Sequence, residues 1–504
     1  MRTDDAGQVD VLIVGAGLSG IGAGCHLRRD CPERTFAILE ARGATGGTWD
    51  LFRYPGIRSD SDMQTLGYAF APWKGAQTIA GGASILRYVR QTAAEYGVEE
   101  RIRFNRRVVS ADYDSGDCTW TVQVQSTNGS HPPETTEMRC SFLLMCTGYY
   151  RYDEGYAPPF EGVERFAGSV IHPQHWPDDL DYAGKRVVVI GSGATAITLV
   201  PAMARTAGHV TMLQRSPSYV ISLPSVDPLD KLARRLLPEM LAYQLVRWKN
   251  VALMTLSYQL SRRRPRLVKA VIRRGVRSQL PEGFDVDTHF APLYDPWDQR
   301  MCVVPDADLF KALHAGTASI VTDQIETFTE RGLKLAGGTE LEADVIVTAT
   351  GLRLQAIGGT TLSVDGEAVH LPDTLAYKGM MLSGLPNFAM TIGYTNASWT
   401  LKADLTADYV CRLLNHMAAH GYRECMPAPD APGVTRRPLL DLASGYVQRS
   451  IQELPSQGTE RPWRMHQNYP LDLLDFRRSD LDDGVMQFSA GRPAAPRQPE
   501  LATA

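Results

Sequence analysis

The chain has 504 residues, 44% hydrophobic and 21% charged, and its 52 basic and 56 acidic residues leave a net charge of −4. This balance gives no indication of a nucleic-acid partner, and the length allows about three domains of ordinary size. Residues 1–8 are too polar for a secretory signal, and no apolar run approaches the ~18 residues of a membrane-spanning helix. Because the eight cysteines show neither CxxC nor zinc-type spacing, we expect a reduced, cytoplasmic protein.

The first predicted strand, residues 9–14, leads directly into the loop Gly15-Ala-Gly17-Leu-Ser19-Gly20. This pattern is typical of a dinucleotide-binding turn. Gly15 permits the tight turn, Gly17 lets the backbone approach a pyrophosphate, and Gly20 allows close packing of helix on strand. The free N–H groups at the start of the following helix, which carries Ser19, are expected to bind the phosphates.

A carboxylate ends the next predicted strand. Residues 36–39 are apolar, and Glu40 follows them, twenty residues after Gly20. A carboxylate at this point accepts hydrogen bonds from ribose hydroxyls and repels a 2′-phosphate. The first site is therefore predicted to bind FAD or NAD rather than NADP.

The segment after Glu40, residues 46–60, contains a glycine pair followed by polar and aromatic residues. It is interpreted either as an irregular structural loop or, in this position, as a segment that wraps the flavin. Under the second interpretation the further candidate cofactor-binding residues are Gly47, Thr48, Trp49, Asp50, Leu51, Arg58, Ser59 and Asp60, together with Val108 on a later stretch.

A second loop of the same kind follows the predicted strand at residues 187–190. Its candidate phosphate-binding residues are Gly191, Ser192, Gly193, Ala194, Thr195 and Ala196. Two such loops, each between a buried strand and a helix, indicate two nucleotides in one molecule, as in enzymes that pass a hydride from one cofactor to another.

No acid ends the strand after the second loop. Gln214 and Arg215 occupy the place that Glu40 has after the first loop. A guanidinium there pairs with an adenosine 2′-phosphate through charge-assisted hydrogen bonds, and Ser216 is a second candidate contact. The second nucleotide is therefore predicted to be NADPH; a solvated surface arginine is the alternative.

The predicted fold class is α/β, with two Rossmann-like dinucleotide-binding domains and a helical insert. Two apolar strands that end in Thr-Gly, at residues 142–148 and 344–351, border the second nucleotide region. We expect a discontinuous FAD domain at 1–150 and 350–504, an NADP domain at 151–349, and within it a helical insert at 223–290.

The helical insert is strongly basic. Between Asp230 and Arg277 it has thirteen lysines and arginines and two acids. Two interpretations stay open: an ordinary insert with a solvated basic face, or an amphipathic surface that contacts either anionic lipid or a partner chain.

The segment FAGSVIHPQHWP, from Phe166 to Pro177, fits an FxGxxxHxxxW pattern. In this motif, and in residues 46–49, 53–56, 296–300 and 393–399, the chain resembles the type I Baeyer–Villiger flavin monooxygenases, most closely the ethionamide-activating subgroup. The resemblance extends over nearly the whole length.

The resemblance implies a defined reaction. NADPH reduces FAD, O₂ adds to the reduced flavin, and the resulting oxidant converts a ketone to an ester or lactone, or a sulfide or thioamide to an S-oxide. Arg300 matches the family's catalytic arginine, which stabilises negative charge, and Asp60 matches the acid beside it. His172 is implied to couple domain rotation to turnover. Gln299 stands where many members have a lysine that helps to hold the 2′-phosphate.

Two other classes of function stay open. An N- or S-oxygenase acting on soft heteroatoms has a similar linking motif but usually lacks the aromatic residue at Trp176. A non-catalytic protein that binds FAD and NADP for stability would have no use for Arg300 and Asp60. A disulfide reductase is disfavoured, because no cysteine pair has the short spacing that it needs. Neither the substrate nor the oligomeric state can be predicted.

Overall fold

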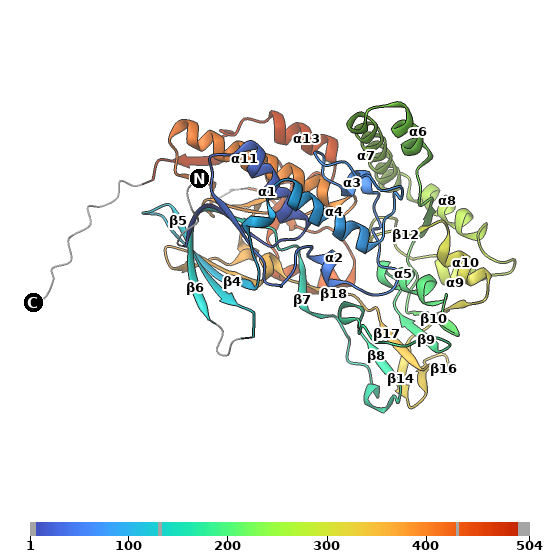
Figure 1. The fold of residues 1–504 in the computed structure, drawn as a ribbon. Helices are drawn as coiled ribbons and strands as arrows, with labels where there is room; N and C mark the ends of the chain where they lie inside the picture. Colours follow the sequence, from blue (N-terminus) through green and yellow to red (C-terminus); the bar gives the residue numbers. More distant parts are fainter. Residues whose placement is uncertain (1–6, 130–133, 430–432, 492–504) are drawn as a thin grey trace, which may run out of the picture.

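The computed structural model describes residues 7–129, 134–429 and 433–491. Figure 1 shows a larger sheet with helices packed on it, a smaller sheet at the opposite end, and a group of helices at the upper right. The predicted α/β class with two Rossmann-like units is confirmed, because each unit has parallel strands with a helix following the first one.

The larger sheet has nine strands, and β1 (Gln8–Val14) lies near its centre. Its parallel neighbours are β2 (Phe36–Leu39) and β6 (Thr135–Met145). The whole of β2 and the last four residues of β1 and of β6 are apolar and buried, whereas the antiparallel β5 (Thr119–Ser126) alternates between buried and half-buried residues. The remaining strands are β3 (Ile102–Arg103), β4 (Arg106–Asp114), β19 (Thr361–Val364), β20 (Glu367–Ala368) and β23 (Phe388–Met390).

Four helices accompany the larger sheet: α1 (Leu18–Asp30), α4 (Gly82–Glu95), α11 (Trp399–His420) and α13 (Tyr469–Arg478). Helix α1 begins directly after the first glycine loop and packs against α4 and α11. Figure 1 shows these helices on one side of the sheet. The sheet thus combines strands from the two ends of the sequence, since β19, β20 and β23 come after residue 350.

The smaller sheet has five parallel strands in the order β13-β10-β9-β17-β8. They are β13 (Ala318–Thr322), β10 (His209–Gln214), β9 (Arg186–Ile190), β17 (Val345–Thr348) and β8 (Ser169–Ile171). Helix α5 (Ala194–Met203) follows β9 through the second glycine loop. The two stretches of chain that join the sheets form an antiparallel pair, β7 (Tyr150–Gly155) with β18 (Leu352–Leu354).

Between β11 (Val220–Leu223) and β12 (Cys302–Pro305) the chain is helical. The helices are α6 (Pro228–Leu236), α7 (Glu239–Arg263), α8 (Pro265–Arg277) and α9 (Val286–Phe290). The inner face of α7 packs on the short helix α3 (Met63–Leu66) of the N-terminal part. None of the helices in the described ranges has the length and hydrophobicity needed to cross a bilayer. All eight cysteines are buried free thiols.

Candidate active site

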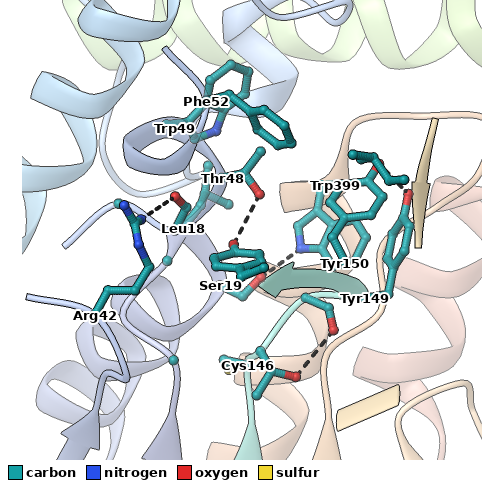
Figure 2. A pocket seen from close by; sticks show the side chains of 18 of the residues that line it. Leu18, Ser19, Arg42, Thr48, Trp49, Phe52, Cys146, Tyr149, Tyr150 and Trp399 are labelled. Atoms are coloured by element: carbon teal, nitrogen blue, oxygen red, sulfur yellow. Dashed lines mark hydrogen bonds between the residues drawn. The ribbon is translucent and has the colours of Figure 1, made fainter. Parts of the chain in front are cut away.

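A cavity of about 570 Å³ opens where the two sheets face each other. Its wall brings together the first glycine loop, residues 46–61, the end of β6, the start of α5, and Arg300. Figure 2 shows the part formed by the first loop and the aromatic residues. The predicted site residues in its wall are Gly15, Gly17, Ser19, Glu40, Gly47, Thr48, Trp49, Arg58, Ser59, Asp60, Val108, Ala194, Thr195 and Arg300.

The first loop has the geometry of a close turn. Gly15 has φ +104°, and a Cβ added to it would lie 2.6 Å from the Cys146 carbonyl oxygen. A Cβ on Gly20 would lie 1.8 Å from the Gly15 oxygen, so this glycine allows the helix to pack on the turn and does not face the cavity. Gly17, Leu18 and Ser19 line the cavity, so the start of α1, with its free N–H groups, lies at the cavity wall.

Glu40 is fixed by the backbone around it. One carboxylate oxygen accepts a hydrogen bond from Ala16 N at 2.8 Å and the other from Arg42 N at 2.9 Å. Burial raises the pKa of Glu40, and these two N–H groups oppose the shift. Each oxygen keeps a lone pair, so the carboxylate is held in place and can still accept a hydroxyl donor.

Two of the predicted residues in the segment 46–60 stand behind the cavity wall. Asp50 is buried and pairs with Arg42 at 2.7 Å and Arg90 at 3.0 Å, and through Arg42 it orients a side chain that does line the cavity. Leu51 packs against the core of the smaller-sheet unit. Thr48 is in the wall, with its hydroxyl 3.4 Å from that of Tyr152 (Figure 2).

Residues 53–60 also connect the two units. Arg58 forms an ion pair with Asp308, Nη1 to Oδ2 at 2.5 Å, on α10 (Asp308–His314). A Cβ on Gly56 would lie 2.9 Å from the Thr198 carbonyl oxygen of α5. This segment therefore contacts α5 and α10 of the smaller-sheet unit.

Only part of the second loop reaches the cavity. Gly191 has φ +140°, and its Cβ would lie 2.4 Å from the Ala349 oxygen, which is again a close turn. A Cβ on Gly193 would meet nothing within 4 Å, so the space in front of the loop is open. Of the six predicted residues, Ala194 and Thr195 line the cavity. The buried Ala196 packs in the core.

At the end of β10, Gln214 is buried, whereas Arg215 and Ser216, which follow the strand, are exposed. Gln214 is buried and donates to His289 O and Thr322 Oγ1, both at 2.9 Å. Arg215 and Ser216 are exposed beside the loop, and Ser192 Oγ donates to the Ser216 carbonyl at 2.9 Å. Within the described ranges Arg215 has no carboxylate partner.

Arg300 and Asp60 come together in the cavity, although 240 positions separate them. The distance from Nη1 to Oδ2 is 3.8 Å, and Arg300 Nε also donates to Thr395 O at 3.4 Å. Burial acts to lower the pKa of Arg300, but Asp60 and the nearby tyrosines outweigh it, so this pKa is raised. The cap of α3 is Asp62, which accepts from Thr65 N, and Asp60 is left to face Arg300.

An aromatic cluster around Arg300 was not predicted from the sequence. Tyr149 and Tyr150 follow β6 with their hydroxyls 3.2 Å apart, and Tyr446 faces both them and Arg300. Burial raises the pKa of Tyr150 to about 12, so its phenol is neutral at physiological pH. The Trp399 ring is tilted by 35° to that of Tyr149, with the ring centroids 5.1 Å apart (Figure 2). A Thr-Gly strand end followed by two aromatic residues is the one local signal for this cluster.

Trp399 connects this cluster to the first loop, since its Nε1 donates to Ser19 Oγ at 2.7 Å (Figure 2).

The segment from Phe166 to Pro177, which fits the FxGxxxHxxxW pattern, lies next to the two stretches of chain that join the sheets. His172 Nε2 is 3.2 Å from the Gly351 carbonyl, and its ring fills the space where Gly155 would have a Cβ. Gly168 allows β8 to approach Asp344. Trp176 packs at the edge of the smaller unit. Burial lowers the pKa of His172, so it acts here as a neutral structural contact between the two joining stretches.

Comparison with known sequences gives consistent matches. The sequence model described as flavin-binding monooxygenase-like matches residues 81–356, and one described as an NAD(P)-binding Rossmann-like domain matches residues 13–72. The FAD-containing monooxygenase EthA of Mycobacterium tuberculosis is 53% identical over 488 residues, 97% of this chain and 99% of that protein.

Two solved structures are similar in fold. An oxidized steroid monooxygenase bound to NADP has a TM-score of 0.75 at 21% identity, covering 96% of this chain and 100% of that one. An open crystal structure of cyclohexanone monooxygenase has a TM-score of 0.71 at 19% identity, covering 84% and 90%.

Proposed function

This chain belongs to the flavin-binding monooxygenase-like family, with FAD and NADPH as its cofactors, and we propose that it is a Baeyer–Villiger monooxygenase. In this reaction one oxygen atom of O₂ is inserted next to a ketone carbonyl to give an ester or lactone. The observation that carries the proposal is the Arg300–Asp60 pair, which faces the same cavity as the first glycine loop.

The residues around the cavity fit FAD. A volume of about 570 Å³ lies within the usual range of cofactor pockets. The N-terminus of α1 would bind the pyrophosphate, and Glu40 would accept the ribose hydroxyls with its remaining lone pairs. Thr48 and Trp49 line the same cavity and would contact the flavin.

NADPH would bind along the second loop. The open space at Gly193 leaves room for the pyrophosphate, and Arg215 is exposed, with no carboxylate of the described residues paired to it. Its guanidinium would pair with the 2′-phosphate, with Ser216 as a second contact. The start of α5 lines the cavity, so a nucleotide bound at the second glycine loop would have its nicotinamide directed toward the flavin.

Bound FAD, once reduced, supplies the activated oxygen for the reaction. When oxygen adds to the carbonyl carbon of the ketone, the carbonyl oxygen gains negative charge. Arg300 holds a fixed positive charge beside this point, and its raised pKa keeps the guanidinium protonated throughout. Asp60 orients that guanidinium, while the neutral phenols of Tyr149 and Tyr150 border it.

Oxidation of sulfides and thioamides is the second candidate function. The lone pair of sulfur attacks oxygen directly, so no oxyanion forms on the substrate and Arg300 is less important for it. The two reactions can therefore be separated by their products and by their dependence on Arg300.

The test is a product analysis under ¹⁸O₂ with FAD and NADPH present. The substrates are a linear, a cyclic and an aryl ketone and an aryl methyl sulfide. We expect at least one ketone to give an ester or lactone that carries one ¹⁸O atom. Labelled S-oxide without any ester would favour an S-oxygenase. Consumption of NADPH with hydrogen peroxide as the only product would contradict both candidates.

A further inference from the structure

The outer sides of α6 and α7 carry apolar side chains that are exposed in the structure; of these, Trp248 also contacts the Tyr469 ring. On α6, Leu232 and Leu236 are 52% and 68% exposed, whereas Asp230 on the opposite side is only 4% exposed. A surface helix normally turns its leucines inward and its acids outward. Helix α6 has the reverse arrangement.

Helix α7 continues this surface. Leu241, Leu245, Trp248 and Leu256 follow one another at helical spacing and are all exposed, Leu256 by 65%. The buried residues of α7, among them Val246, lie on the other side. Figure 1 shows α6 and α7 next to each other at the upper right, and they pack on one another. We call these four side chains, with Leu232 and Leu236, the apolar face.

Unpaired cations accompany the apolar face. Lys231 and Arg235 are exposed on α6, and Arg263, Arg264 and Arg266 are exposed where α7 meets α8. In contrast to Arg262, which pairs with Asp298 at 2.6 Å, none of these five forms an ion pair with a described residue. Of the two acids in this stretch, Asp230 pairs with Arg234 and Glu239 lies 3.6 Å from Lys74.

We propose that α6 and α7 dock the protein onto an anionic lipid surface. The apolar face would enter the boundary between headgroups and acyl chains, and the five cations would lie at the level of the lipid phosphates. Charge argues for lipid over a second copy of the chain. A symmetric dimer through this face would bring two sets of unpaired cations together, while Asp230 and Glu239, the two acids of α6 and α7, are already engaged within the chain.

The inner side of α7 leads to the reaction site. Arg247 Nη1 donates to Gln64 O at 2.6 Å and to Gly67 O at 2.8 Å, and Asn250 Nδ2 donates to Asp62 Oδ1 at 2.8 Å. These residues come just after Asp60. Docking would thus place the cavity one helix away from the lipid. This second step rests on the proposed function: an oxygenase docked in this way would favour lipid-soluble substrates.

The test is flotation of the FAD-loaded protein with vesicles of phosphatidylcholine alone or with 30% phosphatidylglycerol, at low and high salt. We expect binding to the anionic vesicles, weakened by salt because the cations are screened. The double variant Leu241→Glu/Leu245→Glu should lose about tenfold or more in partitioning, since two buried side chains become charged. Arg263→Gln/Arg264→Gln/Arg266→Gln should remove most of the preference for phosphatidylglycerol.

Val163→Glu is the matched control, because Val163 is an exposed apolar residue outside the insert. Circular dichroism and flavin absorbance check that each variant is folded. Failure of the wild-type chain to bind anionic vesicles at low salt would overturn the proposal, and so would equal binding by the leucine variant. A concentration-dependent dimer that the leucine variant loses, without vesicle binding, would assign the face to a second copy. None of these measurements needs turnover, so the proposed function is tested separately.

Discussion

The two glycine loops have nearly the same turn and very different surroundings. The first leads to Glu40, which is buried and held by two backbone N–H groups. The second leads to Arg215, which is exposed and has no described partner. We propose that each turn would bind what the two nucleotides share, a pyrophosphate, and that the residue after the next strand would distinguish the two nucleotides. The carboxylate is preorganised, and the guanidinium is free to meet an incoming phosphate.

Glu40→Arg should break the first site with the largest effect. It removes an acceptor of ribose hydroxyls and places a cation where Ala16 N and Arg42 N donate. If two ribose hydroxyls donate to the carboxylate, the loss of these two hydrogen bonds costs about 3–6 kcal/mol, which corresponds to about a hundredfold to ten-thousandfold in FAD affinity. Flavin content after gel filtration measures it, with Glu40→Gln as the milder control. Full flavin content in Glu40→Arg would show that FAD binding does not depend on Glu40.

Arg215→Ala should affect the second site alone. Loss of one charge-assisted phosphate contact costs about 1.5–3 kcal/mol, so KM for NADPH should increase about tenfold to a hundredfold. KM for NADH should change little, because NADH has no 2′-phosphate. Steady-state kinetics with both nucleotides measures the ratio. If both KM values increased equally, the 2′-phosphate would be recognised elsewhere, and the contrast between the loops would fail.

Asp60→Asn should give the smallest effect of the three variants, on the ester formed per NADPH. Asp60 lies in the cavity that both glycine loops border. The Asp60–Arg300 ion pair is partly exposed, and such pairs contribute about 1 kcal/mol or less. We expect about a fivefold decrease in ester formed per NADPH, with unchanged FAD content. Asp60→Glu should recover part of this loss, as it restores the charge. An unchanged yield in Asp60→Asn would remove Asp60 as a positioning residue.

Local patterns predicted the parts of the site that are local in sequence. The strand–turn–helix geometry at Gly15 and Gly191 and the strand end at Glu40 follow from short motifs, because a tight turn and a parallel strand impose their residues directly. Arg300 and Asp60 were found only through the resemblance to a family. Tyr446 and the Trp399–Ser19 bond were missed, since they meet the site through tertiary packing across hundreds of positions.

The insert shows the same limit in another way. Its basic charge was visible in the sequence, but a leucine at helical spacing normally faces a core. Only the structure distinguishes Val246, which is buried, from Leu245, which is exposed.

The central claim is that the positive charge of Arg300 is required for the insertion of oxygen next to a ketone carbonyl. The most direct measurement is the amount of ester or lactone formed per NADPH consumed by Arg300→Ala, compared with the wild-type chain on the same ketone. Loss of one electrostatic stabiliser typically costs about 3–4 kcal/mol, so ester formation should decrease about a hundredfold to a thousandfold. FAD content should stay unchanged, and the NADPH still consumed should appear as hydrogen peroxide. Ester yield within a few-fold of wild type would contradict the role of Arg300 and, with it, the Baeyer–Villiger assignment.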